Sequence, residues 1–186
     1  MNFTEVVAEV SSIVKRPDKI LDIRREVNAA VNFFSSDTDF KRDVTEVLLA
    51  IDPLAYSQNL TYASLPGFRK VQFMKQAGTR KYITELEASK ITTNACALDK
   101  YYIAGAGIRI NMSSLAASLD LGYFTFPPTL TDAAGTSWML DASPYMVIDR
   151  AAGVIFRNIG DDASSKSHMG ASNAAYLAFR ADHKSS

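Results

Sequence analysis

The residues that could perform nucleophilic or acid–base chemistry are few in this chain of 186 residues. It has 2 histidines, His168 and His183, both near the C-terminal end. Ser165 and Ser167 lie beside His168, and such a pair activates a serine hydroxyl only where rigid structure aligns the two groups. A zinc site would need more His or Cys ligands at short spacing, and neither histidine has them. We therefore expect neither a catalytic residue nor a metal site.

Two further patterns resemble ligand-binding motifs only in part. Gly105 and Gly107 match the beginning of a nucleotide-binding loop, but a strand-like run follows where that motif requires a helix. A hairpin turn is the better interpretation. Paired aspartates occur at 37–39 and 161–162, without the further oxygen ligands and the glycine of a calcium loop. We interpret these aspartates as helix caps and turn residues, and we expect no cofactor.

The composition limits the classes of partner. Lys+Arg and Asp+Glu both number 20, so the formal net charge is zero, and no basic stripe of the kind needed for tight nucleic-acid binding is visible. Cys96 is the only cysteine, which excludes a disulfide within the chain, and we expect it to be a small buried apolar residue. No apolar run is long enough to span a membrane. Glu5 and Glu9 in the opening segment are unlike a signal peptide, so we expect synthesis in the cytoplasm.

Helical periodicity occurs at both ends of the chain. Apolar residues recur at helical spacing over 3–14, with Thr4 as the expected N-cap, and Pro17 follows as a break. A second amphipathic helix is predicted over 18–34, packed against the first as an antiparallel hairpin. Helices return at 144–159, with Pro144 in the first turn, and again from residue 162.

The middle of the chain has the pattern of an antiparallel sheet. Short alternating runs separated by Gly and Pro occur at 43–51, 60–62, 68–74, 81–86, 100–104, 108–112 and 119–126. We therefore predict an α+β fold, in which helices from the N- and C-terminal segments form a layer and carry an inserted antiparallel β-sheet or sandwich. The expected division is a helical core of 1–36 and 137–186 and a β region of 37–136, within a single structural unit overall.

One part of the chain, 101–140, is poor in charge. Its only charged side chains are Arg109, Asp120 and Asp132. Either these strands are buried on both faces of a sandwich, or neighbouring subunits cover part of their surface, because interface cores are depleted in charge. Under the second interpretation, outward strand positions such as Ile110 or Thr125 would face a neighbour.

The C-terminal segment contributes candidate partner contacts. From about Ser164 it is rich in Ser, Ala and Gly, with a sparse apolar face of Met169, Tyr176, Leu177 and Phe179. We expect this segment to be mobile in the free protein and to order when a partner groove covers that face. Trp138, the single tryptophan, is either a core anchor or an interface hot spot.

Three stretches together resemble a known family. The first is SWMLDASPYMVIDRAAGVIFRNIGDD at 137–162, the second is the opening MNFTEVVAEVSSIVKRPDKILDIRREVNAAVNFF, and the third is DKYYIAGAGIRINMSS followed by LGYFTFP. The combination resembles the phage adaptor family, the head-to-tail connector proteins of short-tailed bacteriophages, over nearly the whole chain.

The resemblance implies a structural virion protein and no enzyme. Such a protein is made in the host cytoplasm, is located at the head–tail junction and forms a homo-oligomeric, dodecameric ring. Its partners would be the portal protein, the tail nozzle or fibre proteins and, transiently, the double-stranded DNA in the lumen. Two alternatives stay open, namely a virion-associated cell-wall hydrolase and another capsid- or tail-binding module. A hydrolase with paired acids would have to rely on Asp in the second half, since no Glu follows Glu87.

Overall fold

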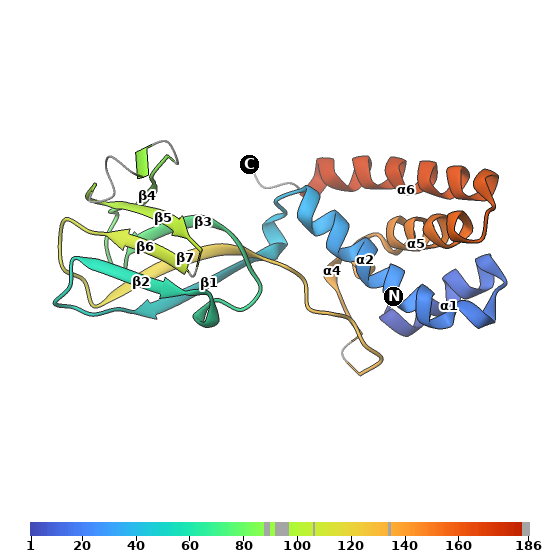
Figure 1. Cartoon of the computed structure of the whole chain (residues 1–186), viewed down its shortest axis with the longest axis horizontal. Helices are drawn as coiled ribbons and strands as arrows, with labels where there is room; N and C mark the ends of the chain where they lie inside the picture. The colour runs from blue at the N-terminus through green and yellow to red at the C-terminus, as the bar shows by residue number, and fades with distance from the viewer. Residues whose placement is uncertain (88–89, 92–96, 106, 134, 184–186) are drawn as a thin grey trace. The chain divides into compact units, whose positions relative to one another are not determined.

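The computed structural model describes residues 1–87, 90–91, 97–105, 107–133 and 135–183. It divides into two compact units (Figure 1). The helical unit consists of Met1–Asp43 and Phe126–Ser186, and the β unit is Val44–Thr125. The predicted α+β class, with terminal helices and an inserted sheet region, is confirmed. The expectation that Cys96 is a buried apolar residue concerns a position outside the described residues.

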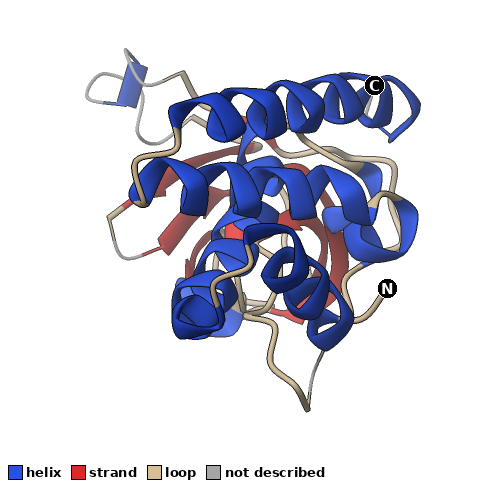
Figure 2. Ribbon diagram, turned by 90° about the vertical axis from the view of Figure 1, so that its right-hand side faces the viewer, coloured by secondary structure: helices blue, strands red, loops and turns tan. Residues whose placement is uncertain are grey.

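The helical unit is built mainly from helices (Figure 2). Each main helix contributes buried apolar side chains to a common core. Its main elements are α1 (Phe3–Val14), α2 (Ile20–Asp37), α4 (Trp138–Ala142), α5 (Pro144–Asn158) and α6 (Asp162–His183). Two short 3₁₀ turns occur at Pro17–Lys19 and Lys41–Asp43. Helix α5 packs on α1, α2 and α6, so segments from both ends of the chain share one core.

Local signals set the ends of these helices. The N-cap of α1 is Asn2 and not Thr4: the Asn2 side chain accepts from the Glu5 N–H, and the Glu5 carboxylate accepts from the Asn2 N–H, each at 2.9 Å. This reciprocal capping box satisfies two backbone donors, which a cap at Thr4 would leave open. After α5, Gly160 adopts a φ of +86°, a left-handed conformation that glycine allows without strain.

The boundaries of the predicted insertion need correction. The sequence pattern places 37–43 and 126–136 in the β region, but they belong to the helical unit. Phe40 and Leu130 lie in the helical core, with at most 2% of their surface exposed. The side chain of Asn28 holds Leu130 through two hydrogen bonds, accepting from its N–H at 2.7 Å and donating to its carbonyl at 3.1 Å. The prediction of a single unit is likewise replaced by two.

The β unit contains two sheets. The three-stranded sheet has the antiparallel order β1 (Val44–Ala50), β7 (Ser118–Thr125), β3 (Phe68–Gln76), and the four-stranded sheet has the order β2 (Ser57–Thr61), β6 (Gly107–Asn111), β5 (Lys100–Ala104), β4 (Thr84–Glu85). The short β4 pairs in parallel with β5, so the second sheet is mixed. Backbone hydrogen bonds from Ile83 to Met74 and from Gln76 to Lys81 join β3 to the segment that precedes β4.

Apolar side chains from both sheets fill one core within the β unit. Ile108 and Ile110 of β6 and Leu119 and Leu121 of β7 are completely buried there. The expectation that Ile110 faces a neighbouring subunit is therefore wrong, because alternation along β6 places it inward and Arg109 outward. Burial within the sandwich also accounts for much of the charge-poor sequence. Over the described part of the chain, no helix has the length and apolar character needed to cross a bilayer.

Candidate functional site

The histidines are located among aromatic and acidic side chains of the helical unit. His168 Nδ1 lies 2.7 Å from Asp149 Oδ1 on α5, and the His168 ring stacks on Phe156. His183 contacts the Phe179 carbonyl at 3.0 Å and stacks on the Phe179 ring at 4.4 Å. The contacts of His168 therefore join α6 to α5, whereas those of His183 with Phe179 lie within α6. Among the described residues, no group of three or more His, Cys, Asp or Glu side chains could hold a metal ion.

Trp138 belongs to an aromatic cluster inside the helical unit. Its ring stacks on Phe179 at 5.3 Å and meets Phe40 edge-on at 5.3 Å. The indole Nε1 donates to Asp43 Oδ1 at 2.8 Å, and the Arg42 guanidinium lies 5.6 Å from the ring centroid. Buried tryptophans normally find such a partner for their N–H. These contacts fit the core-anchor interpretation of Trp138; a contact with a partner stays a prediction.

The structure corrects the expected open face of the C-terminal segment. Tyr176 and Phe179 are 6% and 5% exposed and pack in the helical core, because α6 lies along α5. The Tyr176 hydroxyl also contacts Asp37 and Thr38, at 2.5 and 2.6 Å. Burial, together with the hydrogen bond to Asp37, raises the pKa of Tyr176.

The other two members of that face differ from each other. Met169 packs against Gly153 of α5, where an added Cβ would lie 2.8 Å from its Cγ. Leu177 is 63% exposed. Leu177 is thus the member of the predicted set whose side chain is accessible to a partner in this conformation.

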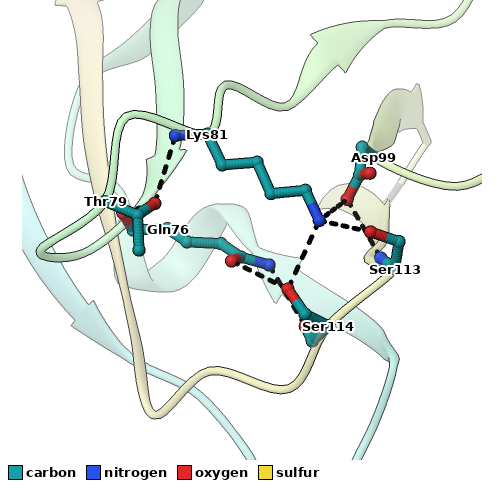
Figure 3. A network of polar contacts seen from close by, with 6 residues as sticks. All are labelled: Gln76, Thr79, Lys81, Asp99, Ser113 and Ser114. Atoms are coloured by element: carbon teal, nitrogen blue, oxygen red, sulfur yellow. Dashed lines mark hydrogen bonds and ion pairs between the residues drawn. The ribbon is translucent and has the colours of Figure 1, made fainter.

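A polar network in the β unit is the arrangement most similar to an active site (Figure 3). The Lys81 ammonium contacts the hydroxyl of Ser113, that of Ser114 at 3.3 Å and the carboxylate of Asp99 at 3.3 Å. Gln76 joins through its side chain, accepting from the Ser114 hydroxyl at 3.0 Å. Sequence reasoning does not bring these residues together, because 18 or more positions separate Lys81 from Asp99 and the two serines.

The chemistry of this network is that of a structural clamp. A serine–lysine nucleophile requires a lysine kept away from water and from carboxylates. Lys81 is 36% exposed and forms an ion pair with Asp99. Burial acts to raise the pKa of Asp99, but hydrogen bonds from Ser113 and the contact with Lys81 outweigh it, so the pKa lies below its usual value. The network fixes the loop after β6 to the turn after β3.

The outward surfaces of the β unit carry the clearest candidates for recognition. On the three-stranded sheet, Phe73 lies over Gly122, whose missing side chain leaves room for the ring: an added Cβ would be 2.3 Å from it. Beside it is a pocket of about 310 Å³, near the lower end of ligand sites, lined by Glu46, Val47, Leu48, Phe73, Lys75, Asp120 and Leu121. The pocket combines an aromatic ring with two carboxylates and one ammonium group.

The outward face of the four-stranded sheet has a different character. Asn59, Arg109 and Tyr102 form one cross-strand row on β2, β6 and β5, and Ser57, Asn111 and Lys100 form the next. Directly opposed residues in antiparallel strands point to the same side, so these polar groups share a face. Exposed Leu54 and Tyr56 precede β2.

Comparison with known proteins gives no match to this chain, either among family models or among curated sequences.

Proposed function

We propose that this chain is a structural adaptor of a short-tailed bacteriophage, a subunit of the ring that joins the portal to the tail. The proposal rests on the resemblance of its terminal and central segments to the adaptor family. In this role the protein has no catalytic turnover. It binds the portal protein on one side and tail proteins on the other, and it contacts the passing DNA weakly.

The observation that carries the proposal is how the resembling segments are used in the fold. The opening stretch and the stretch 137–162 are far apart in sequence, yet α1 and α2 pack directly on α5. The core that they share includes Val10, Val27 and Ile148, all completely buried. A helical body closed by both ends of the chain suits a rigid ring subunit, and the β insertion adds surface for neighbours.

The charges of the helical unit are also consistent with a structural role. Several surface ions are paired with each other, as in Arg16 with Asp18 at 2.8 Å and Arg24 with Asp132 at 2.9 Å. Paired cations are poor phosphate ligands, because binding would have to break the existing pair. Weak DNA contact agrees with a channel through which DNA must slide.

Co-assembly with the portal protein of the same virus tests the proposal. We expect the chain to co-elute with portal rings in size-exclusion chromatography and to give, by native mass spectrometry, a ring of the portal's symmetry. Capsid shells that lack the portal serve as the control and should bind nothing. A folded chain that does not co-elute with the portal would refute the adaptor proposal. Peptidoglycan cleavage that disappears in Lys81→Ala would favour the hydrolase alternative.

A further inference from the structure

The two outward faces of the β unit differ in charge. On the four-stranded sheet, the outward groups of the two central rows include the cations Arg109 and Lys100 and, among the described strand residues, no carboxylate. Arg109 is exposed, while the Lys100 ammonium donates to Thr84 at 2.6 Å. Tyr102 lies opposite Arg109 and adds an aromatic surface next to it. This face presents a guanidinium to its surroundings.

The pocket on the three-stranded sheet has the complementary character. Glu46 and Asp120 contribute two carboxylates against the single ammonium of Lys75, which lies 3.5 Å from Asp120 and 6.0 Å from the Phe73 ring centroid. Among the residues that the structure describes, the side chain of Glu46 has no hydrogen bond or ion pair. A ring face flanked by carboxylates is a favourable site for a guanidinium, which stacks on aromatics and pairs with carboxylates.

These two faces lie on opposite sides of one core. The inward side chains of β6, such as Ile108, and of β7, such as Leu121, meet in that core. Arg109 and Asp120, which alternate with them along the strands, therefore point away from it on different sheets. A patch on one flank and its complement on the other produce a head-to-tail contact, which repeats until it closes a ring or extends as a filament.

We propose that the β units of two copies bind head to tail, with Arg109 of one copy entering the pocket of the next. There the guanidinium stacks on Phe73 and pairs with Glu46 and Asp120, while Tyr102 packs against the exposed Leu48 at the rim. The contact deepens the proposed function, because it names the surfaces that join neighbouring subunits. That the repeated contact closes into a ring rests on the proposed adaptor role. The association weakens with salt, because the charges lie near the surface.

Charge exchange tests the contact. Arg109→Glu and Glu46→Arg each place like charges together, so each variant alone should associate at least tenfold more weakly than the wild type in sedimentation velocity at low salt. Mixing the two variants restores both junctions, because the two introduced side chains meet with opposite charges at one junction and the native pair meets at the other. The 1:1 mixture should therefore assemble like the wild type. Arg80→Glu, an equal charge change at an exposed turn residue, is the matched control and should assemble normally.

Zero-length cross-linking gives a second readout. A carbodiimide joins a carboxylate to an amine in contact, so mixed ¹⁴N and ¹⁵N copies should yield hybrid peptides linking Lys100 to Glu46 or Asp120. A wild-type chain that stays monomeric without such links would overturn the contact. So would a mixture that fails to assemble, an Arg80→Glu variant as weak as Arg109→Glu, or an Arg109→Glu variant that loses only DNA binding.

The outcomes separate this contact from the adaptor role. If copies assemble through these faces but do not bind the portal, the contact is supported and the proposed function is refuted. If portal-bound rings form equally well with Arg109→Glu, the proposed function is supported and the contact is refuted. Circular dichroism of each variant checks the fold, and Arg109→Gln, which removes the charge without reversing it, should show an intermediate loss of association.

Discussion

Replacing Phe179 by alanine should destabilise the helical unit, whereas the same change at Leu177 should not. Phe179 is 5% exposed and is the centre of the aromatic cluster, stacking on Trp138 and on His183 and meeting Phe40 edge-on. Leu177, two positions earlier on α6, is 63% exposed. The pair distinguishes a core role from a partner-contact role within one helix.

The size of the effect follows from what is lost. Truncating a buried phenylalanine to alanine costs about 3–5 kcal/mol in cavity and transfer terms. The loss of its aromatic pairs contributes to the upper part of that range, at about 0.5–1.5 kcal/mol each. Leu177→Ala removes an exposed side chain, so its effect should stay within about 0.5 kcal/mol. Against a total stability of about 5–15 kcal/mol, the difference is large.

The single tryptophan supplies the assay. Trp138 lies against Phe179, so urea unfolding followed by its fluorescence reports on the helical unit. Phe179→Ala should lower the urea midpoint strongly with an unchanged slope, and Leu177→Ala should leave the midpoint in place. A double-mutant cycle with Trp138→Leu, followed by circular dichroism because this change removes the fluorophore, measures the pair itself. Equal midpoints for Phe179→Ala and the wild type would refute the assignment of this residue to the core.

Three other substitutions address separate parts of the fold. Asn28→Ala removes both hydrogen bonds to the backbone of Leu130 and should cost about 2–3 kcal/mol in the same fluorescence assay; unchanged stability would refute a stabilising role for these two hydrogen bonds. Gly122→Ala forces the Phe73 ring outward and should cost about 1 kcal/mol in thermal unfolding of the β unit, and the effect should shrink in a Phe73→Ala background. Hydrogen bonds from the side chains of Arg24 and Thr4 lower the pKa of Asp132 in the folded state. The ionised carboxylate therefore stabilises the fold above the usual pKa of 3.8, and this stabilisation is lost as pH falls through the folded pKa. Asp132→Asn should flatten the decline of stability below about pH 4.

Local periodicity makes the secondary structure predictable. The helices at 3–14 and 144–158 and most of the strands follow from apolar spacing and from Gly and Pro breaks. The boundary of the insertion is less accessible, because Phe40 and Leu130 have the sequence surroundings of ordinary apolar loop residues. Their assignment to the helical core depends on contacts across the fold, such as the hydrogen bonds from Asn28.

The candidate site is predictable in part. Charge depletion points to the region that contains Tyr102, Arg109 and Asp120, but not to the face on which each residue lies. A shift of one residue reverses inward and outward positions in a strand, which is why the sequence alone puts Ile110 on the wrong side. The pocket requires the register of three strands, since Glu46, Phe73 and Asp120 are far apart in sequence.

For the proposed role as a ring subunit, the helical unit and the β unit would meet different requirements. The helical unit buries Tyr176 and Phe179, and these two side chains stabilise α6 against the rest of the core. The β unit leaves Leu48, Tyr56 and other large side chains exposed together with unlike charges on two faces. Because an interface needs accessible surface and a rigid body needs buried surface, we expect variants at the buried positions of α6 to change stability first, and variants on the outer sheet faces to change assembly first.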